Sequence, residues 1–217
     1  DFFFGHRLFR FPNPNVVVGL YLPGFSLTEF RLVTEHPFPV EELFFYLFGF
    51  ICILLFYIWS DEYWLSAYHR AVPEDETHSL RSLIGFHWKA GLAGAGLVAT
   101  ATLARQFLNP SAEGLLPLYL TLQVVLVLVP GVTLLGAVSE RVNWRAFSFT
   151  LALTLFISIL YEVTLGLPGG WWAFQDAAMI GVYIESWHHM PVEEVCLWFA
   201  AAFIAVIVYE TIALLEA

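Results

Sequence analysis

Apolar residues gather into five long runs along the chain, separated by short segments that are polar or contain Pro and Gly. Each run has the roughly 20 mostly apolar residues that a helix needs to cross a bilayer. The pattern therefore predicts an all-α membrane protein, a polytopic helical bundle with about five transmembrane helices. We expect these helices at residues 41–59, 83–107, 114–138, 146–167 and 193–215.

Two of the segments have a distinctive composition. The second run is rich in Gly, Ala and Thr, whereas the other four are rich in Leu, Val, Phe and Ile. Because small residues let backbones approach in lipid, we expect this helix to pack closely against a neighbour. Residues 1–38 are aromatic and interrupted by prolines, which predicts an ordered surface segment and argues against a spanning helix there.

The overall composition agrees with a membrane protein. Hydrophobic residues make up 59% of the chain and charged residues 13%, against about half and a quarter in soluble domains. The net charge of −10 would repel nucleic acid. Cys52 and Cys196 lie inside apolar runs, where a packed thiol is a better interpretation than a disulfide or a metal ligand.

An internal repeat connects the two ends of the chain, over residues 9–59 and 171–215. VVVGLYL is followed by HPFPVEELFFYLF, and AMIGVYI is followed by HHMPVEEVCLWF. Sites in membrane proteins built from two repeats usually lie at the repeat interface. The alignment matches Gly19 with Gly181, Tyr21 with Tyr183, Pro39 with Pro191, and Glu41-Glu42 with Glu193-Glu194.

The PVEE motifs predict two helix starts, since proline suits the first turn and the helix dipole favours carboxylates there. An ordinary helix start would explain one copy, but two copies in the same setting favour a function. Helices four apart in a serpentine chain run the same way, so both pairs are expected on one side, in one cavity. Side chains of adjacent residues point about 100° apart on a helix, and the apolar runs that follow favour Glu42 and Glu194 as the core-facing members.

Glu162 is a further candidate, because an ionisable residue at membrane depth is a functional hypothesis by default. The fourth span ends on the side where the fifth begins, so we expect Glu162 to approach Glu193. The alternative is a structural role as partner of a polar group on another helix, such as Gln123 or Lys89.

Aromatic residues form 18% of the chain, and their ring faces can stabilise a cation. Phe45 and Trp198 lie about one turn into the first and fifth spans and are the expected pocket residues. An interfacial belt is the better interpretation for the tryptophans at span ends, which are Trp59, Trp64, Trp88 and Trp144.

Histidines precede both PVEE motifs. His36, His188 and His189 could form a metal site together with Glu193, but their spacing matches no metal motif. Solvated loop histidines are the better interpretation. We therefore expect no metal and no other cofactor.

The segment WWAFQDAAMIGVYIESWHHMPVEEVCLWF resembles the lycopene cyclase domain family, small integral-membrane carotenoid cyclases that occur as fused or heterodimeric half-units. It has that family's aromatic pair, its hydrophobic-Gly-hydrophobic step and its Pro-x-Glu-Glu helix start. VVVGLYL with FPVEELFF is similar to the equivalent segment of the other half. The resemblance covers nearly all of residues 1–217, a single membrane domain, and implies a seven-helix parent of two repeats with two spans missing here.

The resemblance implies a redox-neutral isomerase reaction, the acid-catalysed cyclisation of lycopene-type ψ end groups, in a bacterial or archaeal cell membrane. A carboxylic acid can protonate carbon only where water is excluded, and two neighbouring carboxyls tend to hold one proton between them. Such a pair can act as acid and base by turns. The implied catalytic residues are Glu41, Glu42, Glu162, Glu193 and Glu194, and the substrate-binding residues are Phe45, Trp198, Tyr183 and Tyr21.

Two alternatives stay open. Water could quench the same cation, which would make the protein a carotenoid hydratase. The chain could instead be a non-catalytic pigment-binding or structural subunit of a membrane complex. The expected partners are accordingly a lycopene-like carotenoid, membrane lipid and, for the last alternative, other subunits of such a complex.

Overall fold

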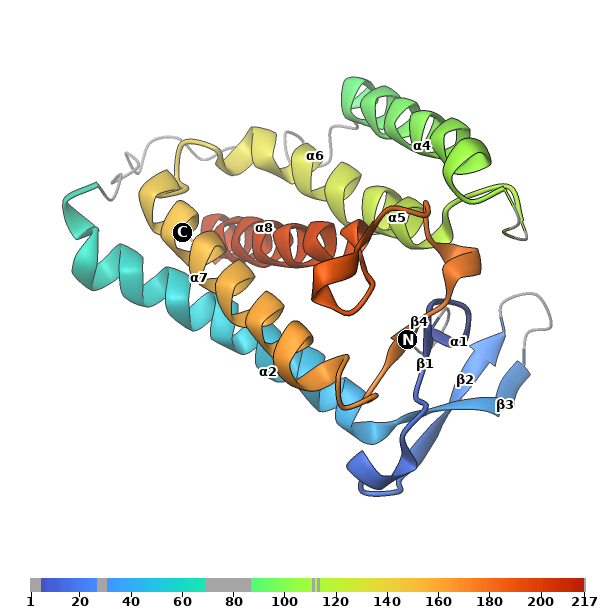
Figure 1. Ribbon diagram of the computed structural model, residues 1–217. Helices are drawn as coiled ribbons and strands as arrows, with labels where there is room; N and C mark the ends of the chain where they lie inside the picture. Colours follow the sequence, from blue (N-terminus) through green and yellow to red (C-terminus); the bar gives the residue numbers. More distant parts are fainter. Residues whose placement is uncertain (1–4, 27–30, 69–86, 111, 113, 217) are drawn as a thin grey trace.

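The computed structural model describes residues 5–26, 31–68, 87–110, 112 and 114–216, without the side chains of residues 5–6, 26 and 31–36. Most of this part of the chain is helical (Figure 1). Four helices are long and apolar enough to cross a membrane. The fold is therefore an all-α bundle of the polytopic membrane type, as the apolar runs predict.

These four candidate spans match the first, third, fourth and fifth predicted helices. The first three spans each join two or three elements, and the last is a single helix. In chain order they are α2 (Val40–Trp59) with η2 (Ser60–Trp64); α5 (Leu118–Gln123), η4 (Val124–Leu128) and α6 (Val129–Val138); α7 (Trp144–Tyr161) with η5 (Glu162–Gly166); and α8 (Val192–Glu216). The second predicted span corresponds to α4 (Trp88–Leu108). This helix is long enough, but it is not apolar enough to count among the four candidate spans.

Each of η2, η4 and η5 is a π-helical turn that continues an α-helix. The turn η4 comes just before Pro130, in the first turn of α6. Proline lacks an N–H and its ring crowds the preceding turn, so a wider turn accommodates it. The turn η5 begins at Glu162, and such turns often occur at functional sites.

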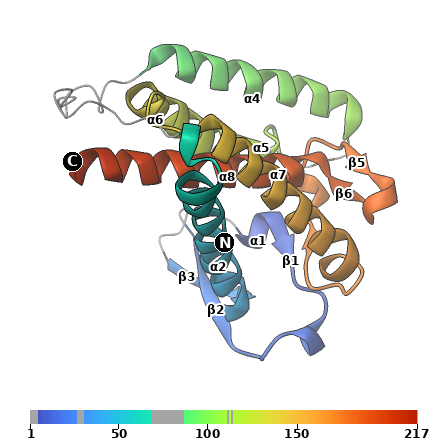
Figure 2. The ribbon, with the colours of Figure 1, turned by 90° about the vertical axis from the view of Figure 1, so that its left-hand side faces the viewer.

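Helix α8 runs through the middle of the bundle and packs against α2, α6 and α7 (Figures 1 and 2). A Cβ at Gly131 of α6 would lie 2.6 Å from Phe203 Cε1 of α8, so glycine permits this close approach. Helix α4 lies at one edge of the bundle, against α6 and η4. A Cβ at Gly94 of α4 would lie 2.6 Å from Val129 Cγ2, which is the close packing that its small residues predict.

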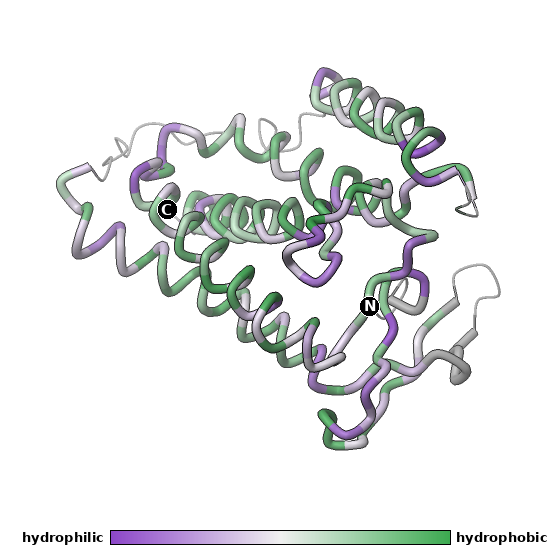
Figure 3. The backbone as a smooth tube through the Cα atoms, in the orientation of Figure 1, coloured by the Kyte–Doolittle hydropathy of each residue, from purple (hydrophilic) through white to green (hydrophobic). Residues whose placement is uncertain are grey.

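Most positions along the helices are hydrophobic, and the polar residues gather at helix ends and connections (Figure 3). Phe44, Phe48 and Leu55 of α2 are exposed examples. The tryptophans that the sequence assigns to an interfacial belt are all exposed: Trp59, Trp64, Trp88 and Trp144.

Short strand pairs lie beside the helical bundle. No spanning helix occurs in the described residues before α2, which agrees with the prediction for this segment, although the strands are not predicted. The pairs are antiparallel: β1 (Phe9–Arg10) with β4 (Ala173–Phe174), β2 (Tyr21–Ser26) with β3 (Arg31–Pro39), and β5 (Tyr183–Ile184) with β6 (Met190–Pro191). The remaining short elements are α1 (Gly5–Leu8), η1 (Pro14–Val16), η3 (Ser66–Tyr68), η6 (Asp176–Ala178) and η7 (Glu185–Trp187).

The two segments of the sequence repeat have the same local structure. Each starts with a 3₁₀ turn, η1 or η6, continues through a glycine with positive φ into a strand pair, and ends in a long helix, α2 or α8. The strand registers also agree, since Tyr21 lies opposite Pro39 and Tyr183 opposite Pro191. The strands β2 and β3 are longer than β5 and β6, which accounts for the wider spacing between the glycine and the proline in the first copy.

Candidate active site

The first glutamate of each PVEE motif binds the backbone of the loop before it. Glu41 Oε1 accepts a hydrogen bond from the Val18 N–H, and Glu193 Oε1 accepts one from the Ile180 N–H at 2.5 Å. In both copies the donor precedes the glycine with positive φ. The other carboxyl oxygen, Oε2, is buried without a hydrogen-bond partner in Glu41 and in Glu193. The first glutamates therefore anchor loops.

The second glutamate of each motif faces an aromatic residue one turn further along its helix. Glu42 lies beside the Tyr46 hydroxyl. Glu194 lies beside the indole of Trp198, whose N–H makes no well-aligned hydrogen bond. Glu194 Oε2 also accepts a hydrogen bond from the Tyr119 hydroxyl of α5 at 2.5 Å.

Glu162 joins the same place from α7. Its Oε2 accepts a hydrogen bond from Trp172 Nε1 at 2.9 Å, and its carboxyl group lies beside that of Glu194. The prediction that Glu162 approaches Glu193 is therefore wrong by one residue, since the neighbour of Glu162 on α8 is Glu194.

The structural partners considered for Glu162 are also wrong. Gln123 Nε2 donates instead to the backbone carbonyl of Glu193 at 3.0 Å. Trp172 takes the role of partner because it packs directly on η5: a Cβ at Gly166 would lie 2.4 Å from Trp172 Cζ2. Glycine at this position lets the indole lie against the helix and reach the carboxylate.

Together, Glu42, Glu162 and Glu194 form a carboxyl cluster at the meeting point of α2, α7 and α8. Glu162 and Glu194 are only 2% and 4% exposed, and Glu42 is half-buried and close enough to interact electrostatically with both. Two neighbouring buried carboxyl groups cannot easily both ionise, so a pair of this kind tends to hold one proton between them. The cluster is therefore suited to proton transfer.

The expectation that Glu42 and Glu194 are the core-facing members agrees with this cluster. However, Glu193 is also completely buried, at 0% exposure. The reason is that the loop before α8 covers the first turn of that helix and donates the Ile180 N–H to it. A projection of the helix by itself does not show that a loop covers its first turn.

Aromatic rings surround the carboxyl cluster. The Phe45 ring centre lies 5.6 Å from that of Tyr161, 5.8 Å from that of Trp172 and 5.7 Å from that of Trp198. Phe45 and Trp198 are the pocket residues that the sequence predicts. Tyr161 and Trp172 were not predicted as pocket residues. Trp172 belongs to the aromatic pair Trp171-Trp172, which looks like part of an interfacial belt.

Two cavities adjoin the cluster. The first, here the carboxyl pocket, has a volume of about 170 Å³ and is lined by Glu41, Glu42, Phe45, Tyr161, Trp171 and Trp172, among others. The second, here the apolar groove, has a volume of about 340 Å³ between α2 and α7, with Trp198 of α8 also lining it. Phe45 and Tyr161 line both cavities.

Tyr21 and Tyr183 line neither of these two cavities, and their substrate contacts stay a prediction. Both belong to strands that pair with the proline of a PVEE motif. The Tyr183 hydroxyl donates to Asp176 Oδ1 at 2.8 Å. Burial, together with this hydrogen bond, raises the pKa of Tyr183. Tyr183 thereby stabilises the loop that precedes α8.

The histidines near the second motif are exposed and have left-handed backbone conformations, with φ of 53° at His188 and 59° at His189. His189 stacks on Tyr183 with ring centres 3.8 Å apart, and its Nδ1 lies 3.0 Å from Glu185 Oε1. The side chain of His36 lies outside the described residues. Within the described part of the chain, no group of three or more His, Cys, Asp or Glu side chains is suited to a metal ion.

No family model, curated protein or solved structure matches this chain. The chemistry of the site is therefore inferred from its residues. A carboxylic acid shielded from water can protonate an alkene carbon, a nearby carboxylate can remove a proton, and aromatic faces can stabilise a cation between these steps. The carboxyl cluster and its aromatic surroundings contain all three kinds of group.

Proposed function

We propose that this protein is a carotenoid end-group cyclase, which converts the ψ end of a lycopene-type carotene into a ring without redox change. The observation that supports this most is the meeting of three carboxyl groups from α2, α7 and α8 beside an aromatic-lined apolar cavity. The resemblance of the two PVEE segments to the lycopene cyclase domain family supports the same activity.

In the proposed reaction, Glu42 meets the substrate, because it is the member of the carboxyl cluster that lines the carboxyl pocket. Protonated Glu42 gives its proton to a terminal alkene carbon, so that a C–H bond forms and the neighbouring carbon becomes a cation. A second double bond attacks this cation and closes the ring. A carboxylate then removes a proton beside the new cationic carbon, and a C=C bond forms. The product is an isomer of the substrate, so no oxidant or reductant is needed.

In this reaction the neighbouring carboxyl groups of Glu162 and Glu194 would keep a proton next to Glu42. This pair can restore the acid after each cycle, since a carboxyl pair readily shares one proton. The faces of Phe45 and Trp172, which both line the carboxyl pocket, are suited to stabilise the cation. An apolar cavity also keeps out water, which would otherwise quench the cation to an alcohol.

In this proposal the protein crosses a bacterial or archaeal cell membrane several times, and lipid surrounds the apolar faces on the outside of the helical bundle. The four candidate spans and the exposed aliphatic and aromatic side chains support this placement. The carotenoid would reach the site from the same hydrocarbon phase.

Pigment analysis of a lycopene-accumulating host that expresses the protein tests this proposal. Wild type is expected to convert lycopene to a cyclised carotene, and Glu42→Gln and Glu194→Gln are expected to lower conversion by about 10² or more, because each loses an acid group. Glu41→Gln and Glu193→Gln are the matched controls. They keep an amide oxygen for the Val18 or Ile180 N–H, so most of the conversion should remain.

Other products would change the assignment. A hydroxylated carotene would identify a hydratase with the same acid step. If wild type is well inserted but lycopene stays unchanged, the cyclase proposal fails for that substrate. Lycopene that copurifies unchanged would then favour a non-catalytic pigment-binding subunit.

A further inference from the structure

Tyr119 of α5 reaches the carboxyl cluster from outside the helices that form it. It is only 3% exposed, and its hydroxyl donates to Glu194 Oε2 at 2.5 Å. Lengths of about 2.5–2.7 Å are typical of a hydroxyl that donates to an ionised carboxylate. The donor to Glu162, the Trp172 indole N–H, lies at the ordinary length of 2.9 Å. The contact with Tyr119 therefore indicates that Glu194 is the ionised member of its pair with Glu162.

The two carboxyls of this pair also lie at helix ends of opposite sign. Glu194 is in the first turn of α8, where the positive end of the helix dipole stabilises a negative charge. Glu162 follows the last residue of α7 and begins the terminal π-helical turn η5, where the negative end of the dipole disfavours such a charge. The proton that the pair shares is therefore more stable on Glu162 than on Glu194.

Tyr119 is held in place by hydrogen bonds on both sides of it in the chain. Just before α5, the Leu116 carbonyl accepts a hydrogen bond from Arg105 of α4. One turn after Tyr119, Gln123 Nε2 donates to the Glu193 carbonyl in the first turn of α8 at 3.0 Å. The Tyr119 hydroxyl is therefore fixed relative to α8, so it stabilises one position and one charge state of the carboxyl that it binds.

Glu194 differs from Glu42 in its access to a substrate. Glu42 lines the carboxyl pocket, whereas Glu194 and Glu162 line neither that pocket nor the apolar groove. Both are also almost fully buried. The buried pair therefore acts on the substrate through Glu42, by the place at which it stores its proton.

We propose that Tyr119 is a positioning residue of the carboxyl cluster. Its hydroxyl holds Glu194 in the ionised form, so that the proton of the pair stays on Glu162, next to Glu42. This proposal rests on the proposed function for the use of the proton, and it adds the residue that determines where the proton is stored. The proton moves only between carboxyl oxygens, so no oxidant, reductant or further reactant is involved.

Carbon-13 NMR of the glutamate side chains tests this placement without turnover. The carboxyl carbon of a protonated glutamate resonates apart from that of an ionised one, so each residue reports its own state. In glutamate-labelled protein in phosphatidylcholine liposomes at neutral pH, Glu162 is expected to be protonated and Glu194 ionised. Glu162→Gln and Glu194→Gln assign the two resonances, because each variant lacks one of them.

Tyr119→Phe removes the hydroxyl and keeps the ring. Without this donor the two carboxyls should share the proton more evenly, so the Glu162 and Glu194 resonances should move toward each other. The kcat for lycopene should fall about tenfold or more without a rise in KM, because the acid is restored less often. Tyr57→Phe is the matched control, since it removes the 2.6 Å hydrogen bond of a buried tyrosine to a glutamate near the other end of α8. Per folded molecule, it should change neither the two resonances nor kcat.

The outcomes separate this inference from the proposed function. A protonated Glu194 in wild type, or resonances that stay in place in Tyr119→Phe, would overturn the role of Tyr119, and cyclisation by wild type would still leave the cyclase intact. An equal change in Tyr57→Phe would assign the effect to lost stability and would also overturn that role. The expected resonances without cyclisation of lycopene would support the stored proton while the cyclase proposal fails.

Discussion

At the residue scale, two glycines set the position of the loop amides that bind Glu41 and Glu193. Gly19 has φ of +89° and Gly181 has φ of +102°, values that an L side chain rarely adopts. The amide just before each glycine is the donor to the glutamate. The two positions share this backbone requirement but differ in their surroundings.

We predict that Gly181→Ala is more destabilising than Gly19→Ala. A Cβ at Gly19 meets nothing within 4 Å, so only backbone strain of about 1 kcal/mol is expected. A Cβ at Gly181 would lie 2.7 Å from Asn109 Cβ and 3.2 Å from the Leu108 carbonyl oxygen, which should raise the loss to about 3 kcal/mol. Thermal unfolding of both variants in detergent, followed by circular dichroism, measures the difference. Equal losses would show that the contact with α4 contributes nothing.

The site could be predicted only where local pattern decides it. Glu42 and Glu194 follow from the repeat and the apolar runs, and Phe45 and Trp198 from their depth in the spans. Tyr119 and Trp172 reach the cluster from other elements, so no spacing in the sequence links them to it. The i,i+4 spacing of Glu42 with Tyr46, repeated by Glu194 with Trp198, is a local pattern that places each aromatic residue on the same helix face as the glutamate.

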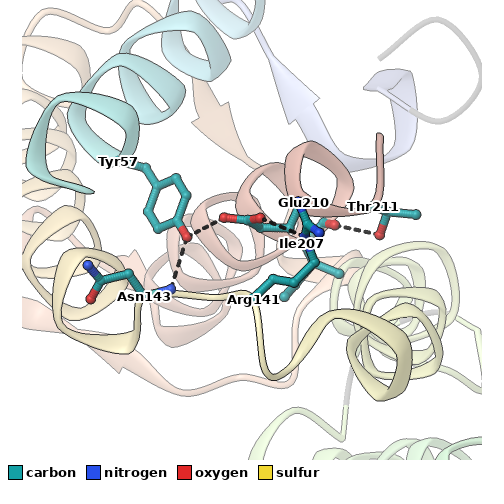
Figure 4. Close-up of polar contacts among 6 residues, drawn as sticks. All are labelled: Tyr57, Arg141, Asn143, Ile207, Glu210 and Thr211. Atoms are coloured by element: carbon teal, nitrogen blue, oxygen red, sulfur yellow. Dashed lines mark hydrogen bonds and ion pairs between the residues drawn. The ribbon is translucent and has the colours of Figure 1, made fainter. Parts of the chain in front are cut away.

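At the element scale, a buried polar network ties α2 to α8 at the end away from the carboxyl cluster (Figure 4). The Tyr57 hydroxyl donates to Glu210 Oε1 at 2.6 Å and accepts a hydrogen bond from the Asn143 backbone N–H at 3.2 Å. Arg141 Nε lies 3.9 Å from Glu210 Oε2. The network therefore also fixes the connection between α6 and α7.

Tyr57→Phe should lower the free energy of unfolding by about 1–3 kcal/mol, because it removes one hydroxyl that serves two buried partners. Tyr209→Phe is the matched control. Its ring contacts that of Tyr57 at 6.1 Å between centres, and its hydroxyl has no hydrogen-bond partner among the described residues. Unfolding in denaturant should therefore separate the two variants. A similar loss in both would assign the effect to ring packing and not to the Tyr57 hydroxyl.

The apolar runs predict that the long helices exist, but they do not predict the details within them. The third span begins at Leu118 and not at 114, because Pro117 takes the position before its first turn. The π-helical turns depend on crowding at Pro130 or on tertiary contacts, which an apolar run does not encode. The short strands were missed because β1 with β4 joins segments far apart in the chain.

At the scale of the whole molecule, the direction of the helices decides which groups meet. The first turns of α2 and α8 bring Glu42 near Glu194, and their far ends bring Tyr57 to Glu210. The two repeat helices therefore run the same way, as expected when three long helices, α4 among them, lie between α2 and α8. In a membrane, this order places both PVEE motifs at one face and the Arg141–Asn143 connection at the other.

This arrangement predicts the labelling of single cysteines in intact cells or sealed vesicles. In a Cys52→Ser, Cys196→Ser background, Val18→Cys and Val182→Cys should react with a membrane-impermeant maleimide from the same side, since both exposed residues lie in the loops before α2 and α8. Glu140→Cys, exposed between α6 and α7, should react from the opposite side. Detergent should make all three reactive. Labelling of Val18→Cys and Val182→Cys from opposite sides would contradict parallel α2 and α8, and with it the meeting of their glutamates in one membrane-embedded site.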